Sequence, residues 1–458
     1  MKHPISLIAG IALSAAIIAW AAPSVFPTGT TTYDPAKAWN GYTVLSPLGG
    51  DGAVVIDMNG NVVKRWEGYN SSAGGPARVL PGGVIVGATG ANAGKQESLA
   101  LVARDFDGKE LWRFDKNEQI TGPNGTATPA LRQHHDWQRE DFPSGYYSPG
   151  VALSLSNTTA KTLILTHVSH ARAPVAGETM LEDDRLIELG ADGKVVWEWT
   201  VSDHIDELHF DKDAREAIHR GGGGRGGFDW FHMNSAAYVG PNHWYDDGDK
   251  RFAPDNVVVS SRAASLIAIV ARDGKIVWQI GPDYSATPEL RAIRQVIGQH
   301  NAHFIPKGLP GAGGLMVFDN GGASGYGRVS PVAPDGQNIY ARPTSRVLEI
   351  DPASLKLVWS YTAPAFFATN ISGAQRLANG NTLITEGPDG RIFEVTKDGA
   401  IVWEYVYPVF SGGGRGRGPT NSVYRAYRVP YEWIPQISKP VERAVTPPMP
   451  GEFRIAQL

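Results

Sequence analysis

A short pattern recurs six times along the chain: a turn, an alternating apolar segment and a tryptophan. The copies span residues 59–66, 107–112, 192–197, 273–278, 354–359 and 398–403. Five of them begin with Asn-Gly or Asp-Gly, which between apolar segments is a strong hairpin signal. We expect type I′ turns, which need positive φ at both central residues. Each copy is therefore interpreted as the outer hairpin of a small sheet.

Two more strands and a less apolar fourth segment precede most of these turns. The strands before the third turn are 163–165 and 185–189. The less apolar segment before the fourth turn is 229–239. Four antiparallel strands repeated six times predict an all-β fold, a six-bladed β-propeller, because stacking around an axis buries both faces of each sheet. The first repeat lacks an innermost strand, so we expect the spare strand 422–428 to close the ring.

The predicted propeller spans 41–437 and is followed by a C-terminal tail at 438–458. Segments near 203–227 and 284–297 interrupt the repeat spacing, and the first of them has helical spacing of apolar residues. Both are expected to cap the channel mouth.

The first 22 residues resemble a targeting segment rather than part of the fold. Residues 5–22 are apolar, and Ala19-Trp20-Ala21 has the form of a signal-peptidase site, which predicts cleavage after Ala21. An apolar stretch of about 18 residues is also at the lower limit for a membrane span, so an uncleaved signal anchor is the alternative. A linker is expected at 23–40, and the remainder is expected in the periplasm or outside the cell.

Composition excludes several classes of function. The formal net charge is −4 with no long basic run, which argues against nucleic-acid binding. The chain has no cysteine, which excludes disulfides, thiol nucleophiles, Cys-ligated zinc and iron–sulfur clusters.

Polar residues gather where the predicted first strand of a blade starts and the second ends, which is one mouth of the channel. The strand starts contribute His134, His135, Asp136, His232, Asn234, His300, Asn301 and Ser372. The strand ends contribute His167, His170, Ser260, Ser261, Arg262, Asp319, Asn320 and Glu386. A single histidine is more often structural, but several with an arginine on one rim predict a site.

Five segments carry a family resemblance: Gln133–Asp136, Asp229–Ser235, Ser260–Arg262, Gln299–Asn301 and Asn421–Arg428. Over roughly residues 33–433 the chain resembles the bacterial arylsulfotransferase (aryl-sulfate sulfotransferase) family, without the separate N-terminal β-domain of well-known members. The resemblance implies an exported six-bladed propeller that is a PAPS-independent transferase. Its small-molecule partners would be an aryl sulfate and a phenol, and no cofactor or metal is expected.

The resemblance also implies roles for the rim residues. His300 would be a histidine nucleophile that is transiently sulfurylated in a ping-pong mechanism. His232 and either His134 or His135 would handle protons and oxyanion charge, and Arg262 would hold the sulfuryl oxygens. The remaining residues expected to bind substrate are Asn234, His170, His167, Asn301 and Asn320.

Other functions compete with this one. The six-fold repeat and the absence of Thr-Gly pairs in the turns argue against a quinoprotein dehydrogenase, and an imidazole-rich rim argues against a calcium site. A non-catalytic exported binding propeller remains an alternative. A His-ligated metalloenzyme using His134, His135, His232 and His300 is another, although the charge of Arg262 would repel a cation.

Overall fold

The computed structural model describes residues 28–49, 52–92, 95–115, 118–121, 127–149, 161–221, 227–412 and 418–446. The predicted targeting segment 1–22 lies outside the described residues. Within the described part of the chain, no helix combines the length and apolar character needed to cross a membrane.

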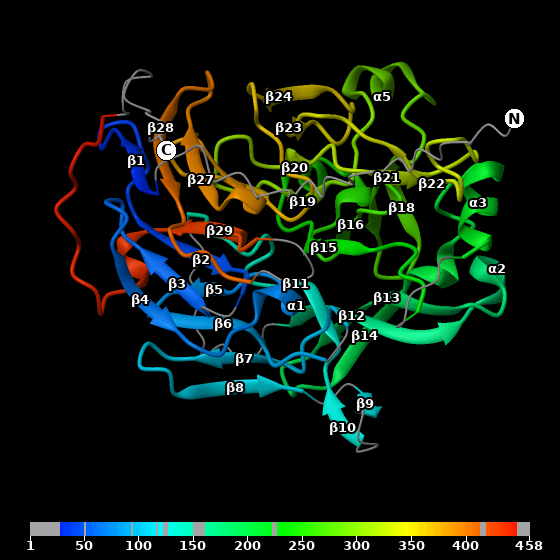
Figure 1. Ribbon diagram of the computed structural model, residues 1–458, viewed down its shortest axis with the longest axis horizontal. Coiled ribbons are helices and arrows are strands. Elements are labelled where there is room, and N and C mark those ends of the chain that lie inside the picture. The colour runs from blue at the N-terminus through cyan, green and yellow to red at the C-terminus, as the bar shows by residue number, and fades with distance from the viewer. Residues whose placement is uncertain are drawn as a thin grey trace, which may run out of the picture.

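Six antiparallel sheets form the ring in Figure 1, five of them with four strands and one with five. Blade 1 consists of β29 (Val423–Val429), β2 (Tyr42–Pro47), β3 (Ala53–Ile56) and β4 (Val62–Trp66). Blade 2 consists of β5 (Arg78–Leu80), β6 (Val84–Thr89), β7 (Ala100–Arg104) and β8 (Glu110–Phe114). Blade 3 consists of β11 (Gln133–Arg139), β12 (Thr162–Ala171), β13 (Met180–Leu189) and β14 (Val195–Thr200).

The other three blades follow the same order from the innermost strand outward. Blade 4 consists of β15 (Met233–Tyr238), β16 (Val257–Ser261), β17 (Leu266–Val270) and β18 (Ile276–Ile280). Blade 5 consists of β19 (His300–Phe304), β20 (Leu315–Asp319), β23 (Arg346–Ile350) and β24 (Leu357–Tyr361). Blade 6 consists of β25 (Gly373–Arg376), β26 (Thr382–Glu386), β27 (Arg391–Val395) and β28 (Ile401–Val406).

The C-terminal strand closes the ring, as the sequence predicts. β29 pairs antiparallel with β2 and supplies the missing innermost strand of blade 1. The expected linker 23–40 also contributes to the fold, because β1 (Gly29–Tyr33) pairs with β28 as a fifth strand of blade 6. Part of the expected tail lies beside it, since Tyr33 and Val445 exchange backbone hydrogen bonds of 2.8 and 2.9 Å.

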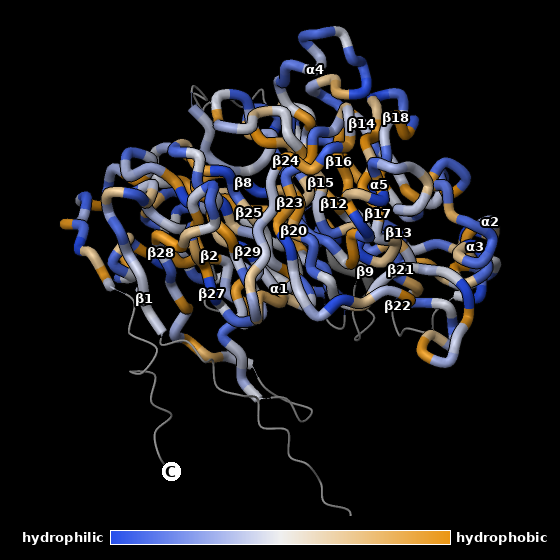
Figure 2. The backbone as a smooth tube through the Cα atoms, turned by 90° about the horizontal axis from the view of Figure 1, so that it is seen from above, coloured by the Kyte–Doolittle hydropathy of each residue, from blue (hydrophilic) through white to orange (hydrophobic). Residues whose placement is uncertain are grey.

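The repeat tryptophans link neighbouring blades. Five of the six donate an indole N–H to a backbone carbonyl in the outer turn of the next blade: Trp66 to Asp105, Trp197 to Arg272, Trp278 to Pro352, Trp359 to Lys397 and Trp403 to Met58. Apolar clusters also span neighbouring blades, for example Ile267 of blade 4 with Val317 of blade 5. Figure 2 shows these segments as apolar lengths of β15, β16, β20 and β23 inside the body. The indole hydrogen bonds give these five repeats a reason to keep their tryptophan.

The prediction of type I′ turns is wrong, as the turn of the first repeat shows. At Asp57–Asn61 the loop has three residues, and only Gly60 has positive φ, at 88°. The pairing shifts register next to the turn, between Val55 and Ile56. This geometry matches a type I turn followed by a left-handed residue in a bulge, which requires one glycine rather than two positive-φ positions.

Insertions add short elements outside the blades. The helices are α1 (Ser71–Gly74), α2 (Ala173–Ala176), α3 (Lys212–His219), α4 (His243–Asp246) and α5 (Pro288–Ile293). Single 3-10 turns lie at η1 (Val201–His204), η2 (Lys250–Phe252), η3 (Gly387–Asp389) and η4 (Tyr431–Trp433). Two hairpins complete the set: β9 (Glu118–Thr121) with β10 (Ala127–Ala130), and β21 (Ser324–Tyr326) with β22 (Gln337–Tyr340).

The two insertions expected to cap the channel mouth contain α3 and α5, and their capping role stays a prediction. Figure 1 places α3 at the right-hand edge of the molecule and α5 near its upper edge, outside the innermost strands. The apolar face of α3, with Ala217 and Ile218, packs into the cluster shared by blades 3 and 4. Its next residue, Arg220, donates to the carbonyl of Asp335 at 3.1 Å in the connection between β21 and β22. The helix therefore supports that hairpin.

Candidate active site

The innermost strands of three successive blades share one backbone irregularity at their start. The pairing of β11, β15 and β19 with the second strand shifts register there. His135, His232 and Asn301 have positive φ values of 53°, 50° and 53°. Non-glycine residues in this region cost on the order of 1–3 kcal/mol each and cluster at functional sites. Bulges redirect side chains, and these three affect the histidine segments that the sequence singles out.

A small polar pocket opens beside the start of β15. Its volume is about 180 Å³, and its lining consists of Asp229, His232, Arg262, Ala263, Gly325, Tyr326, Gln337 and Asn338. His232 Nδ1 lies 2.5 Å from Asp229 Oδ2, so the carboxylate fixes the imidazole orientation. The backbone N–H of Arg262 donates to the carbonyl of His232 at 3.0 Å. His232 and Arg262 therefore share one cavity, but His300, which we expected in the same cavity, is not among the residues that line it.

The electrostatics of this pocket combine one carboxylate with two basic groups. Burial raises the pKa of Asp229, but the contact with His232 and the charge of Arg262 outweigh burial and hold the pKa below its usual value. Burial lowers the pKa of Arg262 without bringing it near neutrality. Among the described residues, the guanidinium makes one long hydrogen bond, from Nη2 to the carbonyl of Ala323 at 3.4 Å. Its remaining donors are suited to an incoming anion.

His300 lies deeper than this pocket, and it is not one of the described residues that line it. Its side chain is buried, with Nδ1 2.8 Å from Asn320 Oδ1 and 3.1 Å from the carbonyl of Gly298. Both partners accept, so Nδ1 carries the proton. Nε2 accepts a hydrogen bond from the backbone N–H of Ile371 at 3.2 Å. Burial, with a further contribution from Arg262, holds the pKa of His300 well below its ordinary value, so the imidazole is neutral.

Three more histidines form a chain behind His232. The rings of His135 and His232 meet edge to face, with centroids 4.8 Å apart. His135 and His134 join through their Nδ1 atoms at 2.8 Å, and His134 stacks on His167 with centroids 3.6 Å apart. Burial holds the pKa values of His134 and His135 well below the ordinary histidine value. His135 is thus the member of the pair that reaches the pocket side.

The predicted asparagines link the backbones of neighbouring blades. Asn234 Nδ2 donates to the carbonyl of Gln299 at 2.6 Å, and Asn301 Oδ1 accepts from the N–H of Ala374 at 3.1 Å. Asn320 orients His300 with its oxygen, while its Nδ2 donates to the carbonyls of Ala368 and Ile371.

His170 lies apart from the histidine chain. It is one third exposed and pairs with Asp183 at 2.8 Å, which raises its pKa. The structure therefore shows an electrostatic partner for His170 on the neighbouring strand, and His170 is not among the residues that line the His232 pocket.

Several residues of the site are missed by the sequence reasoning. Asp229 lies in the resembling motif three residues before His232, and this spacing could have suggested the pair. Tyr326, Gln337 and Asn338 line the pocket from the β21–β22 hairpin, which interrupts blade 5 and gives no repeat signal. Asp184 lies next to His134. It belongs to β13, to which the sequence analysis assigns no functional residue.

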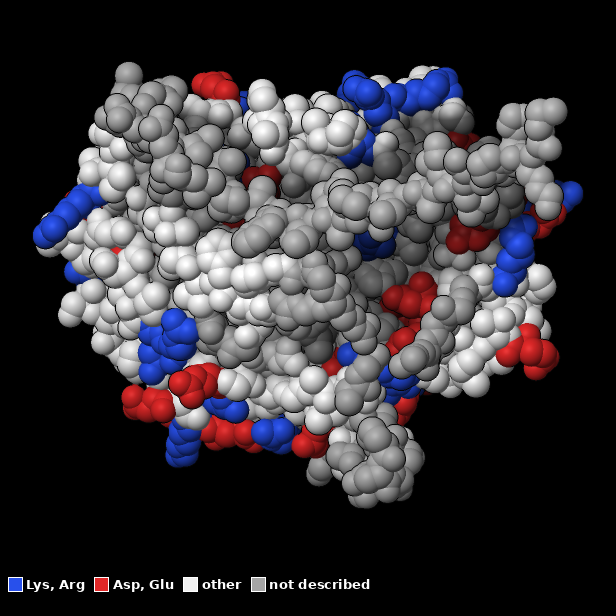
Figure 3. Space-filling view, in the orientation of Figure 1, with Lys and Arg blue, Asp and Glu red and all other residues white. Residues whose placement is uncertain are grey.

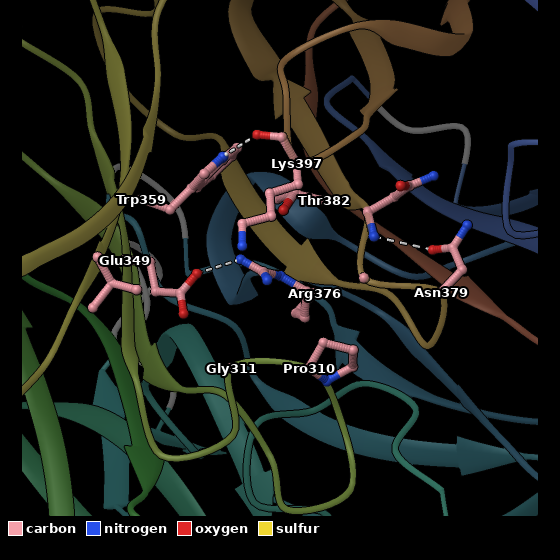
Figure 4. A pocket seen from close by; sticks show the side chains of 11 residues that line it. Pro310, Gly311, Glu349, Trp359, Arg376, Asn379, Thr382 and Lys397 are labelled. Carbon is pink, nitrogen blue, oxygen red and sulfur yellow. Dashed lines mark hydrogen bonds and ion pairs between the residues drawn. The ribbon is translucent and has the colours of Figure 1, made fainter.

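A larger cavity lies elsewhere in the ring. Figure 4 shows a pocket of about 380 Å³ between blades 5 and 6, where Glu349 and Arg376 form an ion pair of 2.6 Å beneath Trp359. Its lining comes from strand ends and turns such as Pro310 and Lys397, and it contains none of the rim histidines. The chemistry of the rim therefore belongs to the smaller pocket.

Sequence comparison identifies the family to which these residues belong. The profile of the arylsulfotransferase (ASST) family matches residues 100–408, about two thirds of the chain. All ten predicted site residues lie within this range. No curated protein matches the chain.

Solved structures resemble the chain only distantly. A protein of unknown function from Bacteroides caccae is 12% identical over 85% of this chain and 99% of its own, with a TM-score of 0.43. A protein from Lactobacillus plantarum is 8% identical over 85% of this chain and 100% of its own, with a TM-score of 0.38. Streptogramin B lyase is 12% identical over 88% and 91%, with a TM-score of 0.35. These likenesses have no bearing on the chemistry of the site.

Proposed function

Because the chain belongs to the arylsulfotransferase (ASST) family, we propose that it transfers a sulfuryl group from a phenolic sulfate ester to a phenol without a nucleotide donor. The observation that carries the proposal is the pocket in which Arg262 meets the Asp229–His232 pair. Sulfuryl transfer, like phosphoryl transfer, needs positioning and charge stabilisation more than covalent chemistry.

Arg262 is proposed to bind the sulfuryl oxygens. Its guanidinium is largely free of protein partners in the described residues, and its planar fork matches an oxyanion geometrically. Burial strengthens this attraction, because the pocket has a lower effective dielectric constant than water. Asn234 and Asn301 hold the strands around this position and act on the substrate through the backbone.

His300 is proposed as the nucleophile. It is neutral, and the proton on Nδ1 leaves the lone pair on Nε2. In the first step the Nε2–S bond forms as the S–O bond to the phenolic oxygen breaks, which releases a phenolate. In the second step an acceptor phenol attacks the sulfur and releases His300. The hydrogen bond from Ile371 must open first, since it occupies the attacking lone pair.

His232 is proposed to move the protons. In its doubly protonated form it gives a proton to the departing phenolate, and it takes one from the acceptor phenol in the second step. Asp229 keeps the ring oriented and stabilises its charge, as the carboxylate does in a catalytic triad. His135, in ring contact with His232, supplies a further polar group at the developing charge.

We also propose that the chain is exported. The apolar run 5–22 and the small-x-small sequence before residue 22 support a signal peptide or an anchor. Residues 5–22 would hold the propeller at the membrane if the segment stays uncleaved.

The decisive experiment is to mix the purified protein with nitrophenyl sulfate alone and measure its mass. We expect a gain of one sulfuryl group that disappears when phenol is added. His300→Ala should show neither the gain nor turnover, while His243→Gln, at an exposed position in α4, should behave as wild type. An unchanged mass with no nitrophenol release over a range of donors would favour a binding propeller instead. A mass gain that persists in His300→Ala but not in His232→Ala would move the nucleophile to His232.

A further inference from the structure

Behind the pocket lie three buried side chains that each have two polar atoms. In each of them one polar atom contacts a neighbouring group, and the other does not take part in that contact. His134 Nδ1 contacts His135 Nδ1 at 2.8 Å, and His167 Nδ1 contacts Glu97 Oε1 at 3.2 Å. Asp184 Oδ2 accepts from the backbone N–H of Met233 at 2.7 Å. The atoms left over are His134 Nε2, His167 Nε2 and Asp184 Oδ1.

These three leftover atoms converge. His134 Nε2 lies 3.3 Å and His167 Nε2 lies 3.7 Å from Asp184 Oδ1, and all three lie within 4.8 Å of one another. The side chains of His134 and Asp184 are 0% exposed, and neither His134 Nε2 nor Asp184 Oδ1 has a hydrogen-bond partner among the described residues. Leaving a buried polar atom unpaired costs about 1–3 kcal/mol, so this arrangement calls for something between the atoms.

We propose that His134, His167 and Asp184 bind one divalent transition-metal ion, of the kind that prefers imidazole and carboxylate ligands, such as Zn²⁺. Ligands about 2.0–2.2 Å from a zinc ion stand roughly 3.3–3.5 Å from each other in a tetrahedral site, close to the separations found here. The two nitrogens and one carboxylate oxygen leave a position for water. Hard cations are excluded by the ligand type, because Ca²⁺ and Mg²⁺ favour oxygen.

The surroundings have the form expected around a metal ion. A metal-bound histidine usually donates its other ring N–H to a carboxylate or another acceptor, and His167 faces Glu97 in this way. Arg132 in turn holds Glu97 at 2.7 Å.

A second set of converging groups is less suited to a metal. Glu97, His167 and Glu182 also approach one another, but they would use His167 Nδ1 and Glu97 Oε1. Arg132 already occupies Glu97 Oε1 through Nε and Nη2, and its positive charge disfavours a cation there. The site proposed here lies on the other edge of the His167 ring.

The stacking of the two rings sets one requirement. The planes of His134 and His167 are 14° apart, so a metal ion must tilt them for both lone pairs to point at it.

Metal binding would also fix which ring nitrogens of the neighbouring histidines carry protons. With a metal on His134 Nε2, the proton stays on Nδ1 and is donated to His135 Nδ1, so neutral His135 must carry its proton on Nε2. The ion would thus set the tautomer of the histidine that touches His232.

The test uses the untagged full chain, first stripped with a chelator and then titrated with Zn²⁺. We expect one equivalent to bind and the melting temperature to rise with free Zn²⁺, because a ligand of the folded state stabilises it. Co²⁺ should give the absorption bands of a low-coordinate site. These readouts do not depend on transferase activity. Wild type that takes up no Zn²⁺ would overturn the proposal and favour a neutral Asp184 that donates a proton to His134.

Variants locate the ion. Asp184→Asn keeps the acceptor for Met233, and His167→Asn keeps a donor near Glu97, so both preserve the outer contacts. Each should weaken Zn²⁺ binding more than about 100-fold, beyond the 10–100-fold that is lost when only a supporting partner is removed. His204→Gln removes a partly buried histidine 2.6 Å from Glu207 and should bind as wild type does. Binding that is lost in His204→Gln, or kept in a correctly folded Asp184→Asn, would refute the assignment.

Discussion

The two halves of the ring use the same strand position in different ways. In blades 3, 4 and 5 the innermost strands carry histidines and begin with a shifted register. In blades 2 and 6 the innermost strands pair in regular register and carry the buried arginines Arg78 and Arg376. Blade 1 adds Arg425 and Arg428 from the closing strand. Each of these arginines has a carboxylate partner, whereas in the histidine half a shifted register and a positive-φ residue recur together at the start of all three innermost strands. The comparison separates a structural half from a half that is free for chemistry.

Surface charge gives no comparable division on the face in Figure 3. Lysine and arginine side chains are mixed there with aspartate and glutamate along the lower edge, over β4 and β8. The contrast between the two halves is therefore a property of the buried channel lining.

The largest expected effect concerns the arginines of the structural half, two of which share the carboxylate of Asp136 on β11 of blade 3. Asp136 Oδ1 lies 2.6 Å from Arg78 Nη2, and its Oδ2 lies 3.5 Å from Arg425 Nη1, with all three side chains 1% exposed. Asp136→Ala leaves two buried cations without their carboxylate, which should lower the free energy of unfolding by about 3–5 kcal/mol. Urea unfolding measures this. Glu110→Gln breaks the exposed pair with Arg113 and should cost less than about 1 kcal/mol. Equal effects would remove the distinction between the halves.

The next effect belongs to the chemical half. Arg262→Ala should cost about 2–4 kcal/mol of transition-state stabilisation, the scale seen when one preorganised donor to a developing charge is removed. The loss should appear in kcat/KM for aryl sulfate, while the urea midpoint stays close to wild type. A large loss of stability with little loss of rate would instead place Arg262 with the structural arginines.

A pH profile sharpens the role of His300. Its pKa is well below the ordinary value, mainly through burial and further through the charges of Arg262 and Arg425. The neutral form is the nucleophile and dominates above the pKa. With nitrophenyl sulfate the leaving nitrophenolate is stable without a proton from His232, so only the protonation of His300 should control this step. The rate of sulfo-enzyme formation should therefore stay flat as the pH falls from about 8 to about 6.5, the ordinary pKa of histidine, and decline only below that.

The measurement is a single-turnover burst of nitrophenol, quenched and read at one fixed pH. A half-maximal rate near pH 6.5 would contradict a buried neutral His300. In Arg262→Ala the decline should move to higher pH, because one of the charges that disfavours protonation is gone.

The ring was predictable because each blade repeats its own turn and tryptophan. The glycine and the indole serve contacts within a blade or with the next one, so a local signal recurs six times. The strand β1 was missed because it follows an apolar segment and a Pro/Thr-rich stretch that read as a linker. Its pairing with β28 depends on ring closure, which no local pattern encodes.

Only those parts of the site that strand order places could be predicted from the sequence. Strand starts and ends correctly bring His232 next to Arg262. Strand alternation could also have separated Asp183 from Glu182 and Asp184, since neighbours point to opposite faces. The contacts follow that rule, because Asp183 pairs with His170 and Asp184 faces His134. The β21–β22 hairpin, which forms one wall of the pocket, is not part of the repeat. Strand order and strand alternation therefore could not predict its position.

The smallest effect tests whether strained backbone marks function. In five outer turns the left-handed position is a glycine, for example Gly274 at φ 87°, but in blade 5 it is Leu355 at φ 56°. A left-handed conformation costs a residue with a Cβ roughly 1–2 kcal/mol.

Leu355→Gly removes that cost, but it also removes the whole half-buried side chain that packs against the cluster between blades 4 and 5 and makes the unfolded chain more flexible, so the net gain should be at most about 1 kcal/mol. Urea unfolding measures the gain, and the transferase rate should not change because the turn lies on the outer rim. His232→Gly relieves similar strain at φ 50° yet removes the Asp229 partner, so it should lose activity whatever happens to stability. If Leu355→Gly alters the rate, strain on the outer rim is coupled to the channel, and positive φ at the histidines no longer sets the chemical half apart.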